Sequence, residues 1–142
     1  MDALHHIDLS TLRKALAVLQ EAIVFWQAQP VGAALKPHLR SAVIQSFEFS
    51  YELAMRSLRR VLMERAIAAD SVTDLSFNDL MRLAADAGFV ADPLSWRRWR
   101  ELRNSTSHGY DERRAEEVAV GAQAFLPESL ELLARLEAAQ NA

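Results

Sequence analysis

The chain has 142 residues, of which 51% are hydrophobic and 25% are charged, and its formal net charge is -3. These proportions are typical of a folded globular protein, and the length predicts one domain over residues 1–142. The sequence has 0 Cys, which excludes disulfides, thiol nucleophiles and thiolate metal sites. No apolar run approaches the ~20 residues of a membrane helix, and Met1–Ser10 lacks the features of a signal peptide. We therefore expect a cytoplasmic protein that is not inserted in a membrane.

Apolar residues recur at helical spacing from the start of the chain. The first predicted helix opens at Asp8 or Ser10 and stops near Pro30. Its inner face comprises Leu9, Leu12, Leu16, Leu19, Ile23 and Trp26. A second, long helix has Pro37 in its first turn. We expect it to run to about Ala69 and to be followed by a polar linker over residues 70–75.

Short polar residues mark the ends of the next two predicted helices. Ser76 is expected to cap a short helix that carries the apolar residues Leu80, Leu83, Ala84 and Ala87, and Gly88 follows as its C-terminal cap. Asp92 and Pro93 have the order of a cap followed by a first helical residue. That helix is expected to end within residues 104–109, where Asn, Ser, Thr and Gly gather.

Asp111 is expected to cap the last helical region, and Pro127 predicts a kink in it or the start of a new segment. Its inner face comprises Val118, Ala122, Phe125, Leu132 and Leu136. The sequence shows neither an internal repeat nor the period-two pattern of a strand. It therefore predicts an all-α protein, an antiparallel four-helix bundle with an additional short helix.

The stretch WRRWRELRNSTSHGY, residues 96–110, carries an unusual concentration of basic residues. Between Trp96 and Arg103 there are four Arg and one Glu, a surplus of three positive charges in an acidic protein. One interpretation is a solvated helix face behind two core tryptophans. The other is that Arg97 and Arg100 bind RNA beside a catalytic group.

Arg103 and His108 lie five positions apart. On a continuous helix they would point ~140° away from each other. Residues 105–107 are Ser, Thr and Ser, which compete for backbone hydrogen bonds and disfavour a helix interior. We therefore expect the helix to end between Arg103 and His108, which allows Arg103, Asn104, His108 and Tyr110 to share a cleft.

These residue types suit a phosphodiester substrate. Arginine is always charged and binds two phosphate oxygens at once, and the imidazole of His108 exchanges protons near neutral pH. RNA carries its own nucleophile, the 2′-hydroxyl, so cleavage without a metal needs a base, an acid and positive charge at the phosphorus. The alternative is a capping histidine with a structural Arg103.

Other classes of site find little support in the sequence. His5, His6 and His38 have no carboxylate or histidine partner at metal-ligand spacing. There is no Gly-rich phosphate loop either. We therefore expect no metal and no cofactor.

The segment QSFEFSYELAMRSLRR, residues 45–60, mixes aromatic, acidic and basic residues at helical spacing. Glu48 and Glu52 lie on one face, and a basic stripe follows at Arg56, Arg59 and Arg60. One interpretation places the aromatics in the core beside a solvated charged face. The other is that this helix lines the same cleft or a subunit interface.

These stretches together resemble a known family. RNSTSHGY, residues 103–110, is similar to the R-x4-H-x-Y motif of HEPN domains. The segments IQSFEFSYELAMRSLRRVL, FNDLMRLAADAGFV, WRRWRELRN and DERRAEEV resemble the HEPN subgroup named nucleotidyltransferase substrate-binding proteins. The similarity extends from about Leu9 to Leu136.

The resemblance implies a dimeric helical bundle with a minimal nucleotidyltransferase as partner, and many such pairs are a toxin and its antitoxin. The HEPN member is a metal-independent ribonuclease. Carried over, Arg103 binds the scissile phosphate, His108 transfers the proton, and Asn104 orients the histidine or the phosphate. Tyr110 matches the tyrosine that the partner adenylylates, and an added AMP would repel RNA.

The older family name supports a rival hypothesis, in which the domain is a noncatalytic subunit that presents a substrate to the nucleotidyltransferase. A third possibility is a purely structural dimer. The first hypothesis predicts RNA cleavage by the chain alone, the second predicts a tight complex without cleavage, and the third predicts neither.

Overall fold

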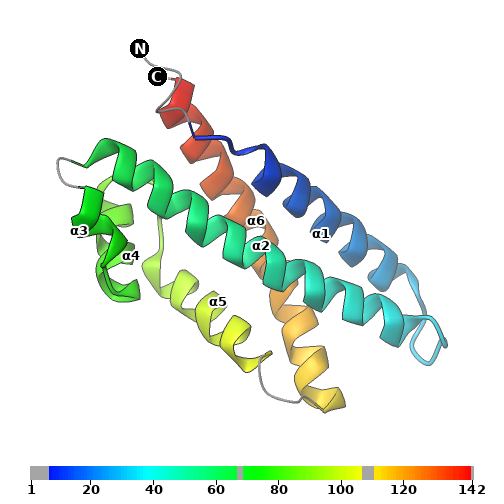
Figure 1. The fold of residues 1–142 in the computed structure, drawn as a ribbon. Helices are drawn as coiled ribbons and strands as arrows, with labels where there is room; N and C mark the ends of the chain where they lie inside the picture. The colour runs from blue at the N-terminus through cyan, green and yellow to red at the C-terminus, as the bar shows by residue number, and fades with distance from the viewer. Residues whose placement is uncertain (1–6, 67–68, 107–110, 142) are drawn as a thin grey trace.

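The computed structural model describes residues 7–66, 69–106 and 111–141. These residues form six helices and no strand. The helices are α1 (Ser10–Ala28), α2 (Lys36–Arg65), α3 (Ala69–Thr73), α4 (Phe77–Asp86), α5 (Pro93–Ser105) and α6 (Glu112–Asn141). Figure 1 shows α1, α2, α5 and α6 as the bundle, with α3 and α4 at one end of α2. The predicted all-α bundle is confirmed.

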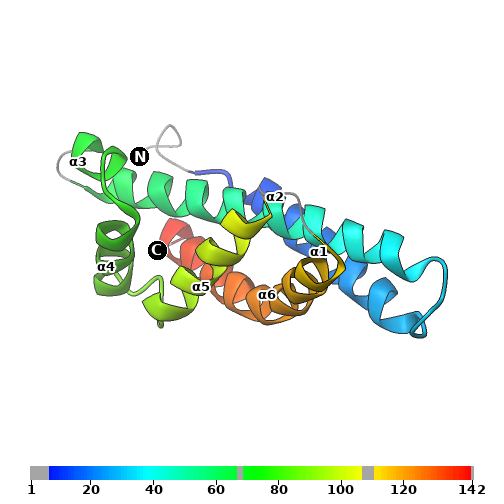
Figure 2. The same cartoon turned by 90° about the horizontal axis from the view of Figure 1, so that it is seen from below.

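The four bundle helices alternate in direction. The start of α6 lies beside the start of α2, where Arg40 pairs with Glu112 at 2.8 Å. The end of α6 lies beside the end of α2, where Gln140 donates to Glu64 at 3.1 Å. Because α1 packs against both α2 and α6 in the opposite direction, the described ends of the chain meet, and Ile7 N donates to Gln140 Oε1 at 2.7 Å. Figure 2, seen from below, shows α5 beside α2 and α6.

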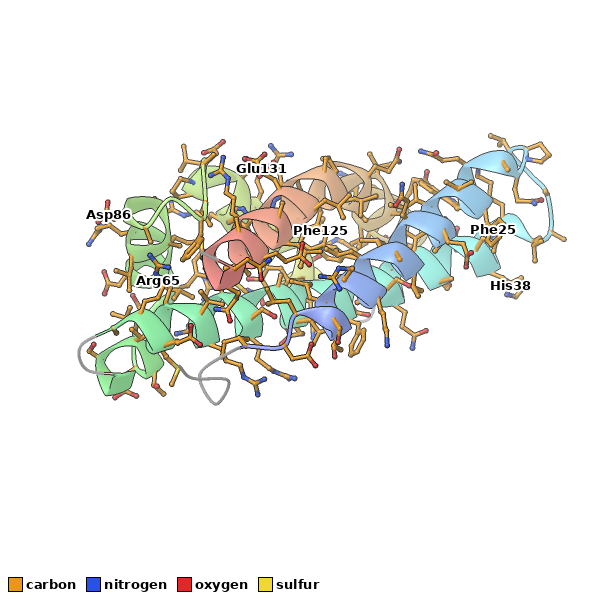
Figure 3. All side chains as sticks on the ribbon, turned by 90° about the horizontal axis from the view of Figure 1, so that it is seen from above. Phe25, His38, Arg65, Asp86, Phe125 and Glu131 are labelled. Atoms are coloured by element: carbon orange, nitrogen blue, oxygen red, sulfur yellow. The ribbon has the colours of Figure 1, made fainter. Side chains whose placement is uncertain are left out.

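Phe125 of α6 is the centre of the core and is fully buried. Its ring lies 5.0 Å from Phe47 and 6.4 Å from Tyr51, both of α2, and 5.9 Å and 6.0 Å from Trp96 and Trp99 of α5. Figure 3 shows Phe125 in the middle of the bundle. Aromatic rings at these separations add to the stabilisation from buried area. This cluster therefore fixes α5 against α2 and α6.

Most of the predicted helix ends are confirmed. Ser76 accepts from Asp79 N at 3.2 Å and Asp92 accepts from Leu94 N at 3.1 Å. Gly88 follows α4 with a φ of +84°, a conformation that favours glycine. Asp111 accepts from the backbone of α6 in the same way. The first helix begins at Ser10, and Asp8 accepts from Ser10 N at 2.9 Å, although the cap position itself is Leu9.

The end of the second helix was predicted wrongly. It ends at Arg65 rather than near Ala69, and part of the expected polar linker forms α3. No glycine or proline marks this break. The reason is tertiary: α3 folds back on α2 and buries Val72, and Arg59 donates to the carbonyls of Val72 and Leu75 at 3.3 Å each.

The sequence left two outcomes open at Pro127, a kink or the start of a new segment. The helix α6 runs through Pro127 without interruption, so no new segment starts there. Pro127 is exposed on α6. Ala87, which was expected among the apolar residues of the short helix, is instead its exposed C-cap residue. The predicted inner faces of α1 and α6 are buried throughout.

Candidate active site

The last turn of α5 carries the arginine of the predicted motif. Trp96 and Trp99 are buried, and Arg103 follows them by seven and four residues, so it lies on the same side of the helix. The guanidinium consequently points toward α2 rather than into open solvent, and the side chain is 27% exposed. The buried tryptophans therefore fix the direction in which Arg103 points.

Two carboxylates of α2 face this arginine. Arg103 Nη1 lies 3.6 Å from Glu48 Oε2, and Arg103 Nε lies 3.2 Å from Glu52 Oε1. The second contact is an ion pair without hydrogen-bond geometry, since Arg103 Nε makes no hydrogen bond within the described chain. Nη1 also donates to Thr106 Oγ1 at 3.2 Å. One guanidinium is thus held by two carboxylates and a hydroxyl.

Thr106 joins the end of α5 to α2. Its hydroxyl has two acceptors within reach, Glu48 Oε2 at 2.5 Å and the carbonyl of Arg103 at 2.7 Å. A hydroxyl has a single proton, and a charged carboxylate is the stronger acceptor. We therefore assign the proton to the bond with Glu48. This bond ties the residue that ends α5 to the middle of α2.

Several cations surround the neighbouring phenol of Tyr51. Burial raises its pKa to about 12, and the nearby charges of Arg100, Arg103 and Arg59 oppose this rise. Tyr51 is therefore a neutral group at physiological pH. The positive charges of Arg100 and Arg103 of α5 and of Arg59 of α2 therefore all lie near the Tyr51 hydroxyl.

The helix break that the sequence predicted is present. The last residue of α5 is Ser105, its C-cap is Thr106, and α6 begins only at Glu112. The helix α5 therefore ends between the sequence positions of Arg103 and His108. His108 and Tyr110 themselves lie outside the described residues, so their distances to Arg103 stay a prediction.

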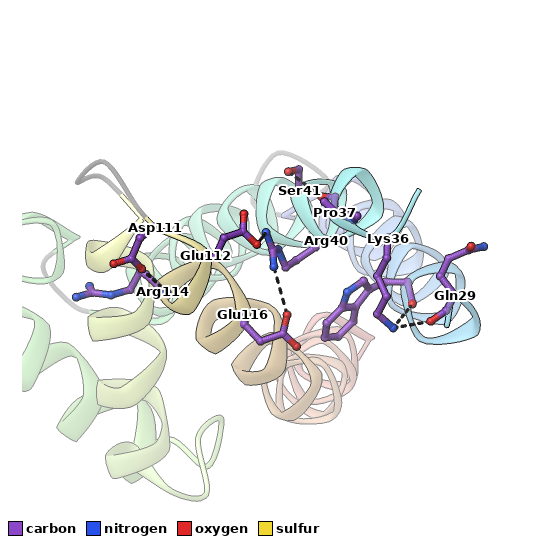
Figure 4. A network of polar contacts seen from close by, with 10 residues as sticks. Gln29, Lys36, Pro37, Arg40, Ser41, Asp111, Glu112, Arg114 and Glu116 are labelled. Carbon is purple, nitrogen blue, oxygen red and sulfur yellow. Dashed lines mark hydrogen bonds and ion pairs between the residues drawn. The ribbon is translucent and has the colours of Figure 1, made fainter. Parts of the chain in front are cut away.

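The start of α6 is also tied to α2. Arg40 donates to Glu112 at 2.8 Å and to Glu116 at 3.4 Å, and these contacts, the hydrogen bond to Glu112 first, raise the pKa of Arg40. Figure 4 shows the pair beside Asp111, which accepts from Arg114 N. Arg40 and Glu48 are eight residues apart on α2, about 12 Å along its axis. One rigid helix therefore holds the end of α5 and the start of α6.

The other predicted site residues of α5 are at the surface. Arg97 is exposed and donates to Asn78 of α4 at 3.3 Å. The guanidinium of Arg100 lies 5.0 Å from the ring centre of Phe77. Asn104 is exposed in the last turn. These three residues share the polar side of α5, next to Arg103.

Sequence reasoning did not identify the partners of Arg103. It grouped Glu48 and Glu52 on one face and considered that α2 lines the cleft, but it did not pair them with Arg103. In the sequence, Thr106 is only one of three neighbouring residues that disfavour a helix interior. The available signal was the pair of carboxylates four residues apart in a helix with buried aromatics, since such a face can bind a cation.

The structure gives no support to the other kinds of site considered from the sequence, within the residues that it describes. His38 is exposed near the start of α2 (Figure 3). Among the described residues, no three His, Cys, Asp or Glu side chains gather as a metal site would need. None of the described helices combines the length and apolar composition that crossing a bilayer requires.

Comparison with known proteins decides the family. The model of the family described as "Nucleotidyltransferase substrate binding protein like" matches residues 7–138. The chain belongs to this family of HEPN-type proteins. A Haemophilus influenzae relative named "Probable ribonuclease HepT" is 33% identical over 136 residues, which cover 92% of each chain.

A solved structure from Haemophilus influenzae, described as the substrate-binding domain of a nucleotidyltransferase, has the same fold. Its TM-score is 0.82 at 33% identity, and the match covers 92% of this chain and 99% of that one. The bundle described above is therefore the fold of the nucleotidyltransferase substrate-binding proteins. The two descriptions, a ribonuclease and a substrate-binding domain, correspond to the two functions that the sequence left open.

Proposed function

We propose that the protein is a metal-independent endoribonuclease of the HEPN type, with Arg103 and His108 as its catalytic residues. The observation that carries the proposal is the end of α5 at Ser105, between the two residues. On an unbroken helix they would diverge by ~140°. With the helix ended, the chain is free to return toward the guanidinium. The similarity to a relative named a ribonuclease supports the same activity.

In the proposed reaction, His108 removes the proton of a ribose 2′-hydroxyl. The 2′-oxygen then attacks the adjacent phosphorus, and the bond from phosphorus to the 5′-oxygen breaks. The leaving oxygen takes a proton from a second imidazole or from water, and the products are a 2′,3′-cyclic phosphate and a 5′-hydroxyl. Arg103 stabilises the charge that develops on the phosphorane.

Arg103 needs a vacant donor for this role. Its Nη1 and Nε face Glu48, Glu52 and Thr106, so we assign Nη2 to the phosphate. A phosphate oxygen can therefore approach Nη2 while the carboxylates keep the guanidinium plane in place. We assign Asn104 to the orientation of His108 or the phosphate, and Arg97 and Arg100 to the RNA backbone.

We further propose that the protein is the toxin of a pair with a minimal nucleotidyltransferase. In this proposal a homodimer places two copies of the motif side by side in the cytoplasm. The partner adenylylates Tyr110, and the added phosphate repels RNA from the cleft. The proposal rests on the family, whose name includes a nucleotidyltransferase.

A second candidate function is a noncatalytic subunit that presents a substrate to the nucleotidyltransferase. One feature of the site favours it: Glu48 and Glu52 together more than balance the charge of Arg103. An arginine held in this way has a smaller net attraction for a phosphate. The description of the structural relative as a substrate-binding domain points in the same direction.

RNA incubation separates the two functions. Purified protein is mixed with total RNA and with tRNA, with and without EDTA. The ribonuclease proposal predicts cleavage in EDTA, products ending in cyclic phosphate, and loss of cleavage in the His108→Ala variant with unchanged thermal unfolding. Cleavage that survives in His108→Ala refutes the catalytic assignment. A tight complex with the nucleotidyltransferase and no cleavage by the wild-type chain supports the second candidate.

A further inference from the structure

A cavity outside the Arg103 site lies between α4 and α5. Its volume is about 310 Å³, within the range of sites that hold a small organic group. The apolar part of its wall is formed by Phe77, Met81, Ala85 and Pro93, and its polar part by Asn78, Arg82, Asp86 and Arg97. We call it the α4–α5 cavity. The cavity combines an aromatic ring, an amide, two guanidinium groups and one carboxylate, so its charged lining has a surplus of one positive charge.

Two of the polar side chains of the cavity, Arg97 and Asn78, are joined by a hydrogen bond. Arg97 Nη2 donates to Asn78 Oδ1 at 3.3 Å, which leaves the amide N–H groups of Asn78 as the donors that face outward. Arg82 is paired with Asp79 at 3.2 Å and is 75% exposed, so its position is less restricted. Arg100 stacks at 5.0 Å on the ring of Phe77. Exposed arginines interleaved with an aromatic ring are typical of surfaces that bind single-stranded nucleic acid.

The cavity is connected to the Arg103 site through α5. Arg97, Arg100 and Arg103 follow one another at three-residue steps, so Arg97 and Arg103 are about 9 Å apart along the helix axis. A stacked nucleotide advances by ~3.4 Å. A nucleotide in the cavity is therefore not one of the two that flank a phosphate at Arg103. It is one or two positions farther along the same strand.

We propose that the α4–α5 cavity binds a nucleotide of single-stranded RNA one or two positions from the cleaved phosphate. The proposal rests on the ribonuclease function given above. The base stacks at Phe77, the Asn78 amide donates to acceptors on the base edge, and Arg97 binds the adjoining phosphate. The cavity thereby makes cleavage depend on the base at that position. The Arg103 site contacts only phosphate and ribose and so does not distinguish one base from another.

Binding is tested without cleavage, using a short fluorescein-labelled single-stranded RNA whose 2′-hydroxyls are methylated. Phe77→Leu keeps apolar packing and removes the ring face, and we expect it to weaken binding about 5-fold or more. Arg97→Gln should weaken binding and lower the slope of log K against log salt by ~0.7, the value for one lost phosphate contact. Lys14→Gln removes one exposed charge from α1 and should change neither quantity.

Cleavage gives a second, independent readout. On a pool of random RNA, Asn78→Ala should change the nucleotide preferred one or two positions from the cut. On a dinucleotide, which spans only the cleaved phosphate, it should leave kcat/KM unchanged. Asn78 and Arg97 are exposed, so their variants should keep the wild-type unfolding midpoint. A lower kcat/KM of Asn78→Ala on the dinucleotide would show that Asn78 acts at the reaction centre and would overturn the proposal.

The outcomes distinguish this proposal from the ribonuclease assignment. If the wild type cleaves RNA while all cavity variants bind and cleave as it does, the cavity proposal is overturned and the nuclease stands. If methylated RNA binds in a cavity-dependent way but no RNA is cleaved, the RNA site stands and the nuclease is overturned. If the variants lose only capture of the nucleotidyltransferase, the cavity is a protein interface and the proposal is overturned.

Discussion

The contact between Glu48 and the end of α5 allows a quantitative prediction. Glu48 Oε2 accepts from the Thr106 hydroxyl at 2.5 Å and lies 3.6 Å from Arg103 Nη1. Glu48→Ala removes both interactions, whereas Glu48→Gln keeps an oxygen that accepts from Thr106 and removes the charge. Glu52→Ala is the matched control, since Glu52 contacts the same arginine through an ion pair alone.

The expected magnitudes follow from exposure and bond type. A hydrogen bond to a charged group contributes about 1.5–3 kcal/mol, and a largely exposed ion pair about 0.2–1 kcal/mol. Glu48 is 31% exposed and Glu52 is 53% exposed. We therefore expect Glu48→Ala to lower the free energy of unfolding by about 2 kcal/mol, Glu48→Gln by about 1 kcal/mol, and Glu52→Ala by less than ~1 kcal/mol.

The assay is urea unfolding followed by circular dichroism, with the variants compared at equal m-value. A double-mutant cycle between Glu48→Ala and Thr106→Val isolates the hydrogen bond, and we expect a coupling of about 1 kcal/mol. In RNA cleavage, Glu48→Ala should lower kcat more than Glu52→Ala does. Equal small losses for both glutamates, together with a coupling near zero, would refute the tie between α2 and the end of α5.

Three further predictions concern the core, a turn and pH. Phe125→Ala should cost about 3–5 kcal/mol in urea unfolding, because the ring is fully buried, whereas Phe25→Ala, at a residue 52% exposed, should change stability by less than ~0.5 kcal/mol. Gly88→Ala should lower the free energy of unfolding by about 1–2 kcal/mol, because φ at this position is +84°. The added methyl group meets nothing within 4 Å, so the loss comes from the backbone conformation alone. An unchanged free energy of unfolding would contradict this argument. Burial raises the pKa of Tyr51 from 10.0 to about 12, so its stabilisation is complete below pH 10 and is lost as the pH rises toward 12. Tyr51→Phe should remove that part of the pH dependence, and an unchanged alkaline profile would exclude Tyr51 as its source.

The helices with periodic faces and explicit caps could be predicted well. The inner face of α1 is buried as predicted, and Ser76 and Asp92 cap their helices. The failures occurred where no local residue marks the event. The break after Arg65 has no glycine or proline, and α3 gains its stability from packing on α2 rather than from its own five residues.

In the candidate site, too, the features set by local sequence could be predicted and those set by tertiary contacts could not. The polar run after Arg103 was sufficient to predict the end of α5, because serine and threonine disfavour a helix interior through their own hydrogen bonds. Which groups meet Arg103 could not be predicted. Glu48 and Thr106 are 58 positions apart, and no local pattern relates them. The cavity between α4 and α5 was missed for the same reason.

The sequence by itself determined the helical class, the burial of the periodic apolar faces and the point at which α5 ends, because each depends on neighbours within a few residues. Only the tertiary structure decided the surroundings of Arg103 and the way α2 holds the start of α6. Those contacts depend on the angle at which helices cross, and the crossing is set by the packing of Phe125 against the aromatic residues of α2 and α5. Side-chain shape across the whole core, rather than any local preference, therefore places the charged groups of the site.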